Sequence, residues 1–333
     1  MMGLTKERGP KKRDLSLTSE RGSQVWAVGF YNAVGSSKLG EVFSDPCNPT
    51  IPASLKFAEG TASMKFLFTD ANLGQFANQV SYLDGGPQYS ALIDPVGTGD
   101  AAPVTGRVER KVQLLQVDIA VRDSRATKTG WIFGTFGWIG PIRGDGFFDN
   151  LVPVSLQWAN DQGNYSMKME ESWINPVIES KMIGWPERPA LGFNGRANGP
   201  ADNIRSSCLS CHSAARIPRS SKGLLGFSFQ IPGDLSDASK VKSHVDTWFN
   251  NLQPGEMFDP TNPAGVAALD YSLQIEAATT RMCQACEDGA MSGTTPHICM
   301  TSGAYVEQNC RTISIMSAIA SQNKRMSVPL PRQ

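Results

Sequence analysis

An alternation of apolar and polar side chains between residues 115 and 121 constrains the fold of this chain more than any other feature. Apolar residues occupy every second position there, in the order Leu115, Gln116, Val117, Asp118, Ile119, Ala120 and Val121. Successive side chains of a β-strand point to opposite faces of a sheet. The pattern therefore predicts a half-buried strand with its apolar side chains on the core face.

Four further segments have the composition of strands, and they span residues 24–31, 63–69, 130–136 and 151–158. The segment at 130–136 follows soon enough after Asp123 to be a hairpin partner of the first strand. Pro153 places the last segment at a sheet edge or delays its start. The 333 residues include 32 Gly and 21 Pro, which favours many turns. We expect a mixed, mainly β fold with an antiparallel sandwich-like domain or a distorted barrel.

Helical signals come later in the chain. Asp234 or Ser236 could cap a helix that runs to about Leu252, because apolar residues recur at helical spacing in that stretch. A second helix is predicted from Ala264 to about Met282. We expect four parts: a disordered N-terminus at 1–22, a β-rich domain at 23–180, an irregular region with two helices at 181–282, and a Cys-containing tail at 283–333.

The pattern C-x-x-C-H occurs once, at residues 208–212. Two thiols at this spacing can each add to a vinyl group of one porphyrin, and the adjacent imidazole can then bind the iron. With 7 Cys and 3 His in the chain, about 0.001 such matches are expected by chance. The pattern predicts one covalent haem c, anchored by Cys208 and Cys211, with His212 as the proximal iron ligand.

Two other interpretations of the cysteine pair are a redox C-x-x-C site and half of a zinc site. A thioredoxin-like pair should close a strand and open a helix. Residues 195–203 are instead polar and rich in turn formers, which predicts a loop before the motif. A short helix is expected from Cys211 to Arg216, ending near Pro218.

The chain resembles a family of uncharacterised bacterial cytochrome c proteins over roughly residues 25–275. The resemblance implies an exported protein with a single haem, and it implies no particular substrate. The tail from Cys283 onward lies outside it. The stretches that carry the resemblance are Asp45–Pro49, Lys65–Thr69, Leu114–Asp123, Gly130–Phe136, Leu151–Val154, Glu171–Pro176 and Ser206–His212.

The sixth ligand of the iron would separate electron transfer from chemistry at an open iron. His244 lies at the edge of the apolar stripe of the first helix and is one candidate, the alternative being a hydrogen-bonded histidine at the core boundary. Met257 follows Gly255 and Glu256 in a predicted loop and is the other candidate. Most methionines simply fill the core, so an open site is also compatible with the sequence.

The tail has a second C-x-x-C pair, Cys283 and Cys286, but Glu287 replaces the histidine, so we expect no second haem. Disulfides are the favoured interpretation of the tail cysteines in an oxidising compartment. A zinc site that includes His297 is the alternative. Cys47 is expected to be a buried small residue. The cysteines available for disulfides are Cys283, Cys286, Cys299 and Cys310.

These features predict an exported monohaem c-type cytochrome that passes one electron to a redox partner protein. The alternatives are an open-site haem enzyme, either a peroxidase or a small-substrate oxidase, and a haem-based sensor or binding module. A net charge of zero favours no nucleic-acid partner, and no apolar run is long enough for a membrane span. The sequence leaves the oligomeric state open.

Haem c attachment implies a periplasmic or extracellular location. Residues 1–22 contain six basic and three acidic residues and lack the apolar segment of a signal peptide. We therefore expect that a leader is missing from this N-terminus or that the start is misassigned.

Overall fold

In the computed structural model of this protein, the chain folds into two compact units. Unit 1 contains Met1–Ser37, Phe57–Cys211 and Ile231–Gln253, and unit 2 contains Lys38–Lys56, His212–Gln230 and Pro254–Gln333. The residues that the structure describes are 4–7, 9–10, 14–16, 18–19, 22–45, 49–52, 54–93, 107–140, 146–181, 191–218, 237–256 and 266–279.

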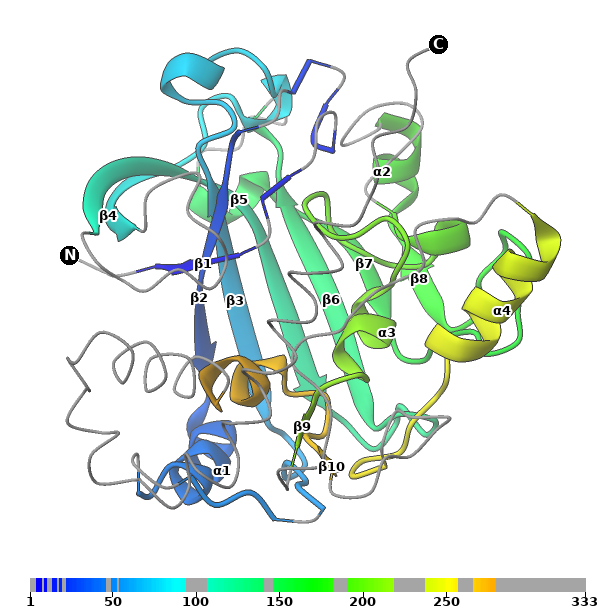
Figure 1. The fold of residues 1–333 in the computed structure, drawn as a ribbon. Coiled ribbons are helices and arrows are strands. Elements are labelled where there is room, and N and C mark those ends of the chain that lie inside the picture. The colour runs from blue at the N-terminus through cyan, green and yellow to red at the C-terminus, as the bar shows by residue number, and fades with distance from the viewer. Residues whose placement is uncertain are drawn as a thin grey trace, which may run out of the picture. The chain divides into compact units, whose positions relative to one another are not determined.

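Unit 1 is built on an antiparallel sheet of eight strands, ordered β1-β2-β3-β5-β6-β7-β8, with β4 pairing beside β5 (Figure 1). The mainly β, antiparallel fold class predicted from the sequence is confirmed. The strands are β1 (Thr5–Lys6), β2 (Val25–Tyr31), β3 (Ala62–Thr69), β4 (Gln88–Ile93), β5 (Val108–Arg122), β6 (Trp131–Trp138), β7 (Leu151–Gln157) and β8 (Ser172–Ile174).

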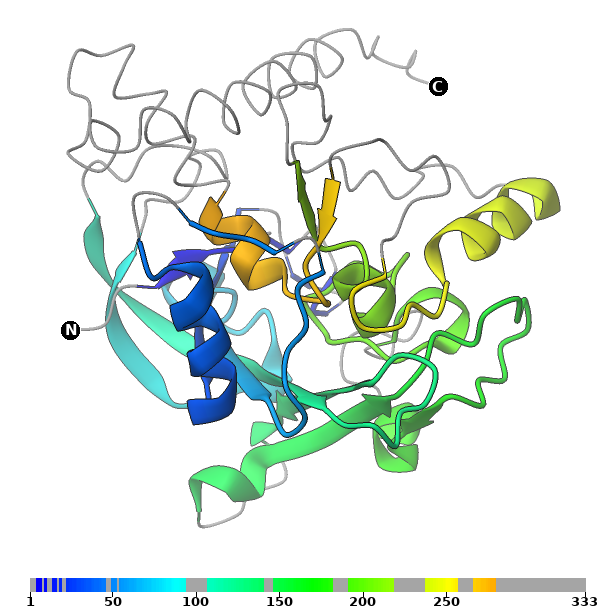
Figure 2. The same ribbon diagram turned by 90° about the horizontal axis from the view of Figure 1, so that it is seen from below.

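The strands of unit 1 described here all join one sheet, which differs from the two packed sheets of the expected sandwich. Short helices and loops cover one face of the sheet where a sandwich would place a second sheet. Figures 1 and 2 show α3 (Cys208–His212) and α4 (Ala238–Trp248) on this side of the strands. Side-chain hydrogen bonds from the sheet to the backbone before and within α3 replace sheet-to-sheet packing.

A row of apolar side chains crosses the opposite face of the sheet. Cross-strand pairing aligns Phe30, Met64, Ile119, Gly134, Leu156 and Trp173 on six successive strands. Phe30, Met64 and Trp173 are exposed. A Cβ atom on Gly134 would come within 2.7 Å of the Leu156 side chain. The glycine therefore leaves room for the Leu156 side chain within the row.

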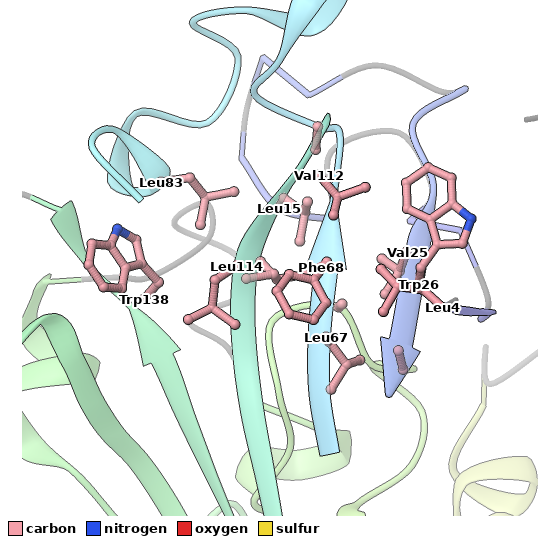
Figure 3. Close-up of a cluster of buried hydrophobic side chains, with 14 of the residues drawn as sticks. Leu4, Leu15, Val25, Trp26, Leu67, Phe68, Leu83, Val112, Leu114 and Trp138 are labelled. Atoms are coloured by element: carbon pink, nitrogen blue, oxygen red, sulfur yellow. The ribbon is translucent and has the colours of Figure 1, made fainter. Parts of the chain in front are cut away.

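The main hydrophobic core lies around one end of strands β2, β3 and β5. Figure 3 shows Leu4 and Leu15 from the N-terminal segment among the side chains of these strands. Both leucines are buried, and β1 pairs with β2. This order differs from the disordered N-terminus expected for residues 1–22. Two apolar anchors and a backbone ladder hold the described part of a segment whose composition is otherwise polar.

Helix α4 begins one residue after Asp237, whose side chain accepts a hydrogen bond of 2.9 Å from the Lys240 amide. Asp237 is therefore the cap, and not Asp234 or Ser236. Further helices among the described residues are α1 (Ala33–Val42), α2 (Pro176–Lys181) and the 3₁₀ helices η1 (Gly74–Phe76), η2 (Ser81–Leu83), η4 (Phe147–Asn150) and η5 (Phe193–Gly195). Within the described ranges, no helix is long and apolar enough to cross a membrane.

Unit 2 contains the antiparallel strands β9 (Arg216–Pro218) and β10 (Val266–Ala268) and a helical stretch at residues 273–279. The helix predicted from Ala264 to Met282 is therefore wrong over residues 266–272. Backbone pairing with β9 recruits Val266–Ala268, and the chain then turns through Asp270 and Tyr271, both with positive φ angles. Tertiary pairing overrides local helix propensity here.

Replacing Leu114 with alanine tests the core, because Leu114 is fully buried in the cluster of Figure 3. We expect the free energy of unfolding to fall by about 2–5 kcal/mol. Met64→Ala on the neighbouring strand is the matched control, since Met64 is exposed, and it should cost less than about 1 kcal/mol. Urea unfolding curves measure both values, and equal losses would contradict this description of the core.

Candidate functional site

Helix α3 displays the C-x-x-C-H residues on one side. Positions three and four residues apart share a helix face, so Cys208, Cys211 and His212 lie together. These three residues are partly exposed, whereas Leu209 and Ser210 between them are buried. The two cysteines are not joined in a disulfide. The helix thus brings two thiols and one imidazole to one side, where each is partly exposed.

Ser207 sets the start of α3. Its Oγ accepts a hydrogen bond of 3.1 Å from the Ser210 amide, and the Oγ of Ser210 accepts one of 2.8 Å from the Ser207 amide. This reciprocal pair is a capping box in which serine takes the usual place of Glu or Gln. The Ser207 hydroxyl also lies 3.1 Å from Oδ1 of Asn160, which ties the cap to the chain beyond β7.

The sheet holds the segment before and within α3 through amide side chains. Oε1 of Gln157 on β7 accepts from the Leu209 amide at 3.0 Å. Oε1 of Gln116 on β5 accepts from the Ala201 amide at 3.2 Å. Both glutamines are fully buried. A buried backbone N–H needs an acceptor, so these contacts fix the height and orientation of the motif above the sheet.

Arg196 braces the loop that leads to the motif. Its side chain is fully buried and donates to the backbone oxygens of Asn160, Asp161 and Asn164 at 2.8–3.1 Å. Its guanidinium also stacks on the Phe249 ring at 4.2 Å. Burial lowers the pKa of Arg196 to about 10, although Asp161 and Glu171 oppose that shift. The predicted loop before the motif is therefore a tightly bonded one.

A polar cluster lies under Cys208. The Nε2 of Gln116 donates to both carboxylate oxygens of Asp118 at 3.0 and 3.1 Å and to Asp202 at 3.2 Å. The Thr135 hydroxyl donates to Asp118 at 2.8 Å. The two aspartates are partly buried, whereas Gln116 and Thr135 are buried. One amide group therefore links two carboxyl groups beside the first cysteine of the motif.

This environment shifts the proton affinities of the cluster. Burial and then the neighbouring Asp202 raise the pKa of Asp118 to about 7, against opposing contributions from Thr135, Lys65 and Gln116. Burial, followed by Asp202 and Asp118, also raises the pKa of the Cys208 thiol well above its usual value. Cys208 is therefore kept as a neutral thiol at physiological pH.

In unit 2, Nδ1 of His212 donates a hydrogen bond of 2.9 Å to the backbone oxygen of Tyr271. A carbonyl oxygen can only accept, so the proton of the neutral imidazole lies on Nδ1 and the lone pair lies on Nε2. Asp270 and Tyr271, with φ angles of 45° and 66°, form the turn that presents this oxygen. Metal-bound histidines are oriented by the same kind of hydrogen bond.

Glu276 is a second carboxyl group of unit 2 with an altered proton affinity. It is buried, and its Oε2 accepts from the Arg216 amide at 3.0 Å. Burial raises its pKa to about 7, although the Arg216 amide and charge act in the opposite direction.

His244 lies on α4 in unit 1 and is almost fully buried. Its Nε2 donates to the Arg205 backbone oxygen at 2.8 Å, and its Nδ1 has no hydrogen-bond partner within the described structure. The rings of Phe193 and Phe249 lie 4.7 and 5.4 Å from the imidazole. Burial lowers its pKa. The structure thus places His244 in an aromatic box, and its role as sixth ligand stays a prediction.

Several predicted residues lie outside the described part of the chain, namely Met257, Cys47 and the tail residues Cys283, Cys286, His297, Cys299 and Cys310.

The described residues of the motif fit a covalent haem. They supply two thiols on one helix face and an imidazole with its lone pair on Nε2, which is the donor set that haem c requires.

Replacing Glu276 with glutamine tests the buried carboxyl group. Its pKa rises from 4.5 to about 7 on folding, so it binds a proton more tightly in the native state. The stability this provides is complete below about pH 4.5 and is lost as the pH rises through about 7, a change of up to about 3 kcal/mol. Unfolding curves at several pH values should show a flatter decline for Glu276→Gln. An unchanged decline would contradict the assignment.

Comparison of the chain with models of protein families, with curated proteins and with solved structures found no match. The resemblance to bacterial cytochrome c proteins therefore stays a prediction. The function is inferred below from the geometry of α3 and its surroundings.

Proposed function

We propose that this chain is an exported monohaem c-type cytochrome that passes single electrons to a redox partner protein. One observation carries the proposal: the three motif residues share one partly exposed side of α3, and the last of them donates its Nδ1 proton to the Tyr271 carbonyl. Chance placement of a C-x-x-C-H sequence would not require this tautomer of the histidine.

Each residue has a defined task in this proposal. The Cys208 and Cys211 thiols would hold the haem by adding to its two vinyl groups, and Nε2 of His212 would bind the iron. A haem bound here supplies the iron that gains and loses one electron. The Tyr271 carbonyl orients the imidazole and increases its basicity. The capping box of Ser207 and the Gln157 hydrogen bond hold the anchoring helix still during electron transfer.

The thiol chemistry of Cys208 also supports haem over a redox disulfide. A reactive C-x-x-C pair needs a cysteine with a lowered pKa, usually next to a positive charge or at the start of a long helix. Burial, and then the charges of Asp202 and Asp118, instead raise the pKa of Cys208. The acidic surroundings disfavour the thiolate that disulfide exchange requires.

The visible spectrum of the protein tests this function. The chain is expressed with a supplied leader peptide in cells that contain a haem-attachment system, and the product is extracted with acidified acetone. We expect haem to stay with the protein, with sharp α and β bands after reduction and no change on adding CO. Cys208→Ala/Cys211→Ala should retain no haem, because both thioether bonds are lost.

The second C-x-x-C pair supplies a matched control, since Cys283→Ala/Cys286→Ala removes two thiols at the same spacing without a following histidine. This variant should keep its haem. A high-spin spectrum that shifts with CO or peroxide would favour the open-site enzyme or the sensor. Wild-type protein without retained haem would overturn the proposal and favour a thiol or metal role for the pair.

A further inference from the structure

The polar cluster beneath Cys208 lies in a row of charged and polar side chains across the sheet. Lys65 on β3, Asp118 on β5 and Thr135 on β6 are direct cross-strand neighbours. Asp202, from the loop before α3, joins the row through Gln116. Neither the motif nor the proposed electron transfer requires two carboxyl groups at this place.

We propose that Asp118, with Asp202 beside it, is a proton-binding site that takes up a proton when the haem takes up an electron. The redox part of this proposal rests on the proposed function. The proton site itself depends on the donors and charges around the two carboxyl groups.

Asp118 and Asp202 share one amide donor, the Gln116 side chain. Asp118 accepts from Thr135 and Gln116, and Asp202 accepts from the Gly199 amide at 2.9 Å and from the same Gln116 nitrogen. Lys65 is the cation that acts on both, and it also forms a salt bridge of 3.1 Å with Glu7. Full ionisation of these four groups would leave a net charge of about −2.

One proton on the pair removes half of that charge. Two like charges that share a site cannot both ionise easily, so one of the carboxyl groups takes up a proton at a higher pH than usual. The raised pKa of Asp118, about 7, agrees with this arrangement. The thiol of Cys208 faces the pair from α3 as a neutral group and adds no countercharge.

The pair is coupled to the motif through Cys208, because both carboxylates act electrostatically on its sulfur. That sulfur is the atom through which the porphyrin would be attached. Adding one electron from the redox partner makes the surroundings more negative and favours uptake of one proton from solvent. The oxidised state with two carboxylates thus gains one electron and one proton, and becomes the reduced state with one carboxylate and one carboxylic acid.

The midpoint potential of the haem-loaded protein, measured as a function of pH, tests the coupling. A one-electron couple that takes up one proton loses up to about 59 mV for each pH unit, since this equals a tenfold change in the equilibrium constant. We expect a decline of this kind around neutral pH in the wild-type protein. Asp118→Asn should flatten it, because the titrating carboxyl group is lost. Asp202→Asn should move it to lower pH, because the burial of Asp118 remains while the neighbouring charge is removed.

Two further variants keep the test interpretable. Asp246→Asn removes one negative charge from the exposed face of α4, where Asp246 pairs with Lys242, and should leave the pH dependence unchanged. Thr135→Val removes a donor that favours ionised Asp118, so it should shift the pH dependence to higher pH without removing it. Circular dichroism confirms that each variant is folded.

Infrared spectroscopy of the full chain made without the attachment system tests the proton site separately. Glu276 is a second carboxyl group with a pKa of about 7, so the measurement uses the Glu276→Gln protein. A carboxylic acid band that disappears near neutral pH in this protein, and is absent from Asp118→Asn/Glu276→Gln, would support the site. Absence of such a band from Glu276→Gln would overturn it. Haem-loaded protein with a pH-independent potential would overturn the coupling alone. Failure to retain haem would overturn the proposed function and the coupling together, and the infrared titration would then decide on the proton site.

Discussion

The hydrogen bonds from buried glutamines of the sheet to the backbone of the motif segment determine the rest of the arrangement in unit 1. A sheet face that carries Gln116, Thr135 and Gln157 cannot be covered by a second apolar layer without leaving polar atoms unsatisfied. Polypeptide backbone is a suitable cover, because its N–H groups match the glutamine oxygens. Ala201 and Leu209 supply these N–H groups, so the cover is the loop and helix that carry the cysteines.

The same constraint sets the electrostatics around Cys208. Covering the polar face brings Asp202 of the loop to the Asp118 side chain of β5, with the Gln116 amide between them. Burial, and then the neighbouring Asp202, raise the cost of ionising Asp118. A thiol placed beside them stays protonated. The packing requirement and the proton chemistry are therefore two consequences of one arrangement.

The strands could be predicted from the sequence, but the covering of one face of the sheet by a loop and a helix could not. The alternation at 115–121 correctly placed Leu115 and Val117 in the core, but Ile119 and Val121 of the same pattern are only partly buried. The segments at 24–31 and 63–69 match β2 and β3 closely. The alternation also suggested that Gln116 faces solvent, yet Gln116 is fully buried. Periodicity distinguishes the two faces of a strand, but the partner of each face is set by distant residues.

In the candidate site, too, the residues close together in the sequence could be predicted and the distant ones could not. The C-x-x-C-H motif names three residues directly because their spacing on one helix turn is local. The Tyr271 carbonyl, which orients His212, is a backbone group 59 residues away and has no side-chain signature. The predicted helix from 264 to 282 assigned this carbonyl to a helix, whereas the chain forms a turn with positive φ angles at that point.

The two described histidines, each compared within its own unit, show why the tautomer matters more than the presence of an imidazole. Both donate to a backbone carbonyl, but His212 does so through Nδ1 and His244 through Nε2. The lone pair of His212 therefore lies on Nε2, the nitrogen farther from its own backbone. That of His244 lies on Nδ1, inside the box formed by Phe193 and Phe249. For His244 to bind a metal through Nε2, it would first have to give up its bond to Arg205, whereas His212 keeps its bond to Tyr271 and binds through the opposite nitrogen.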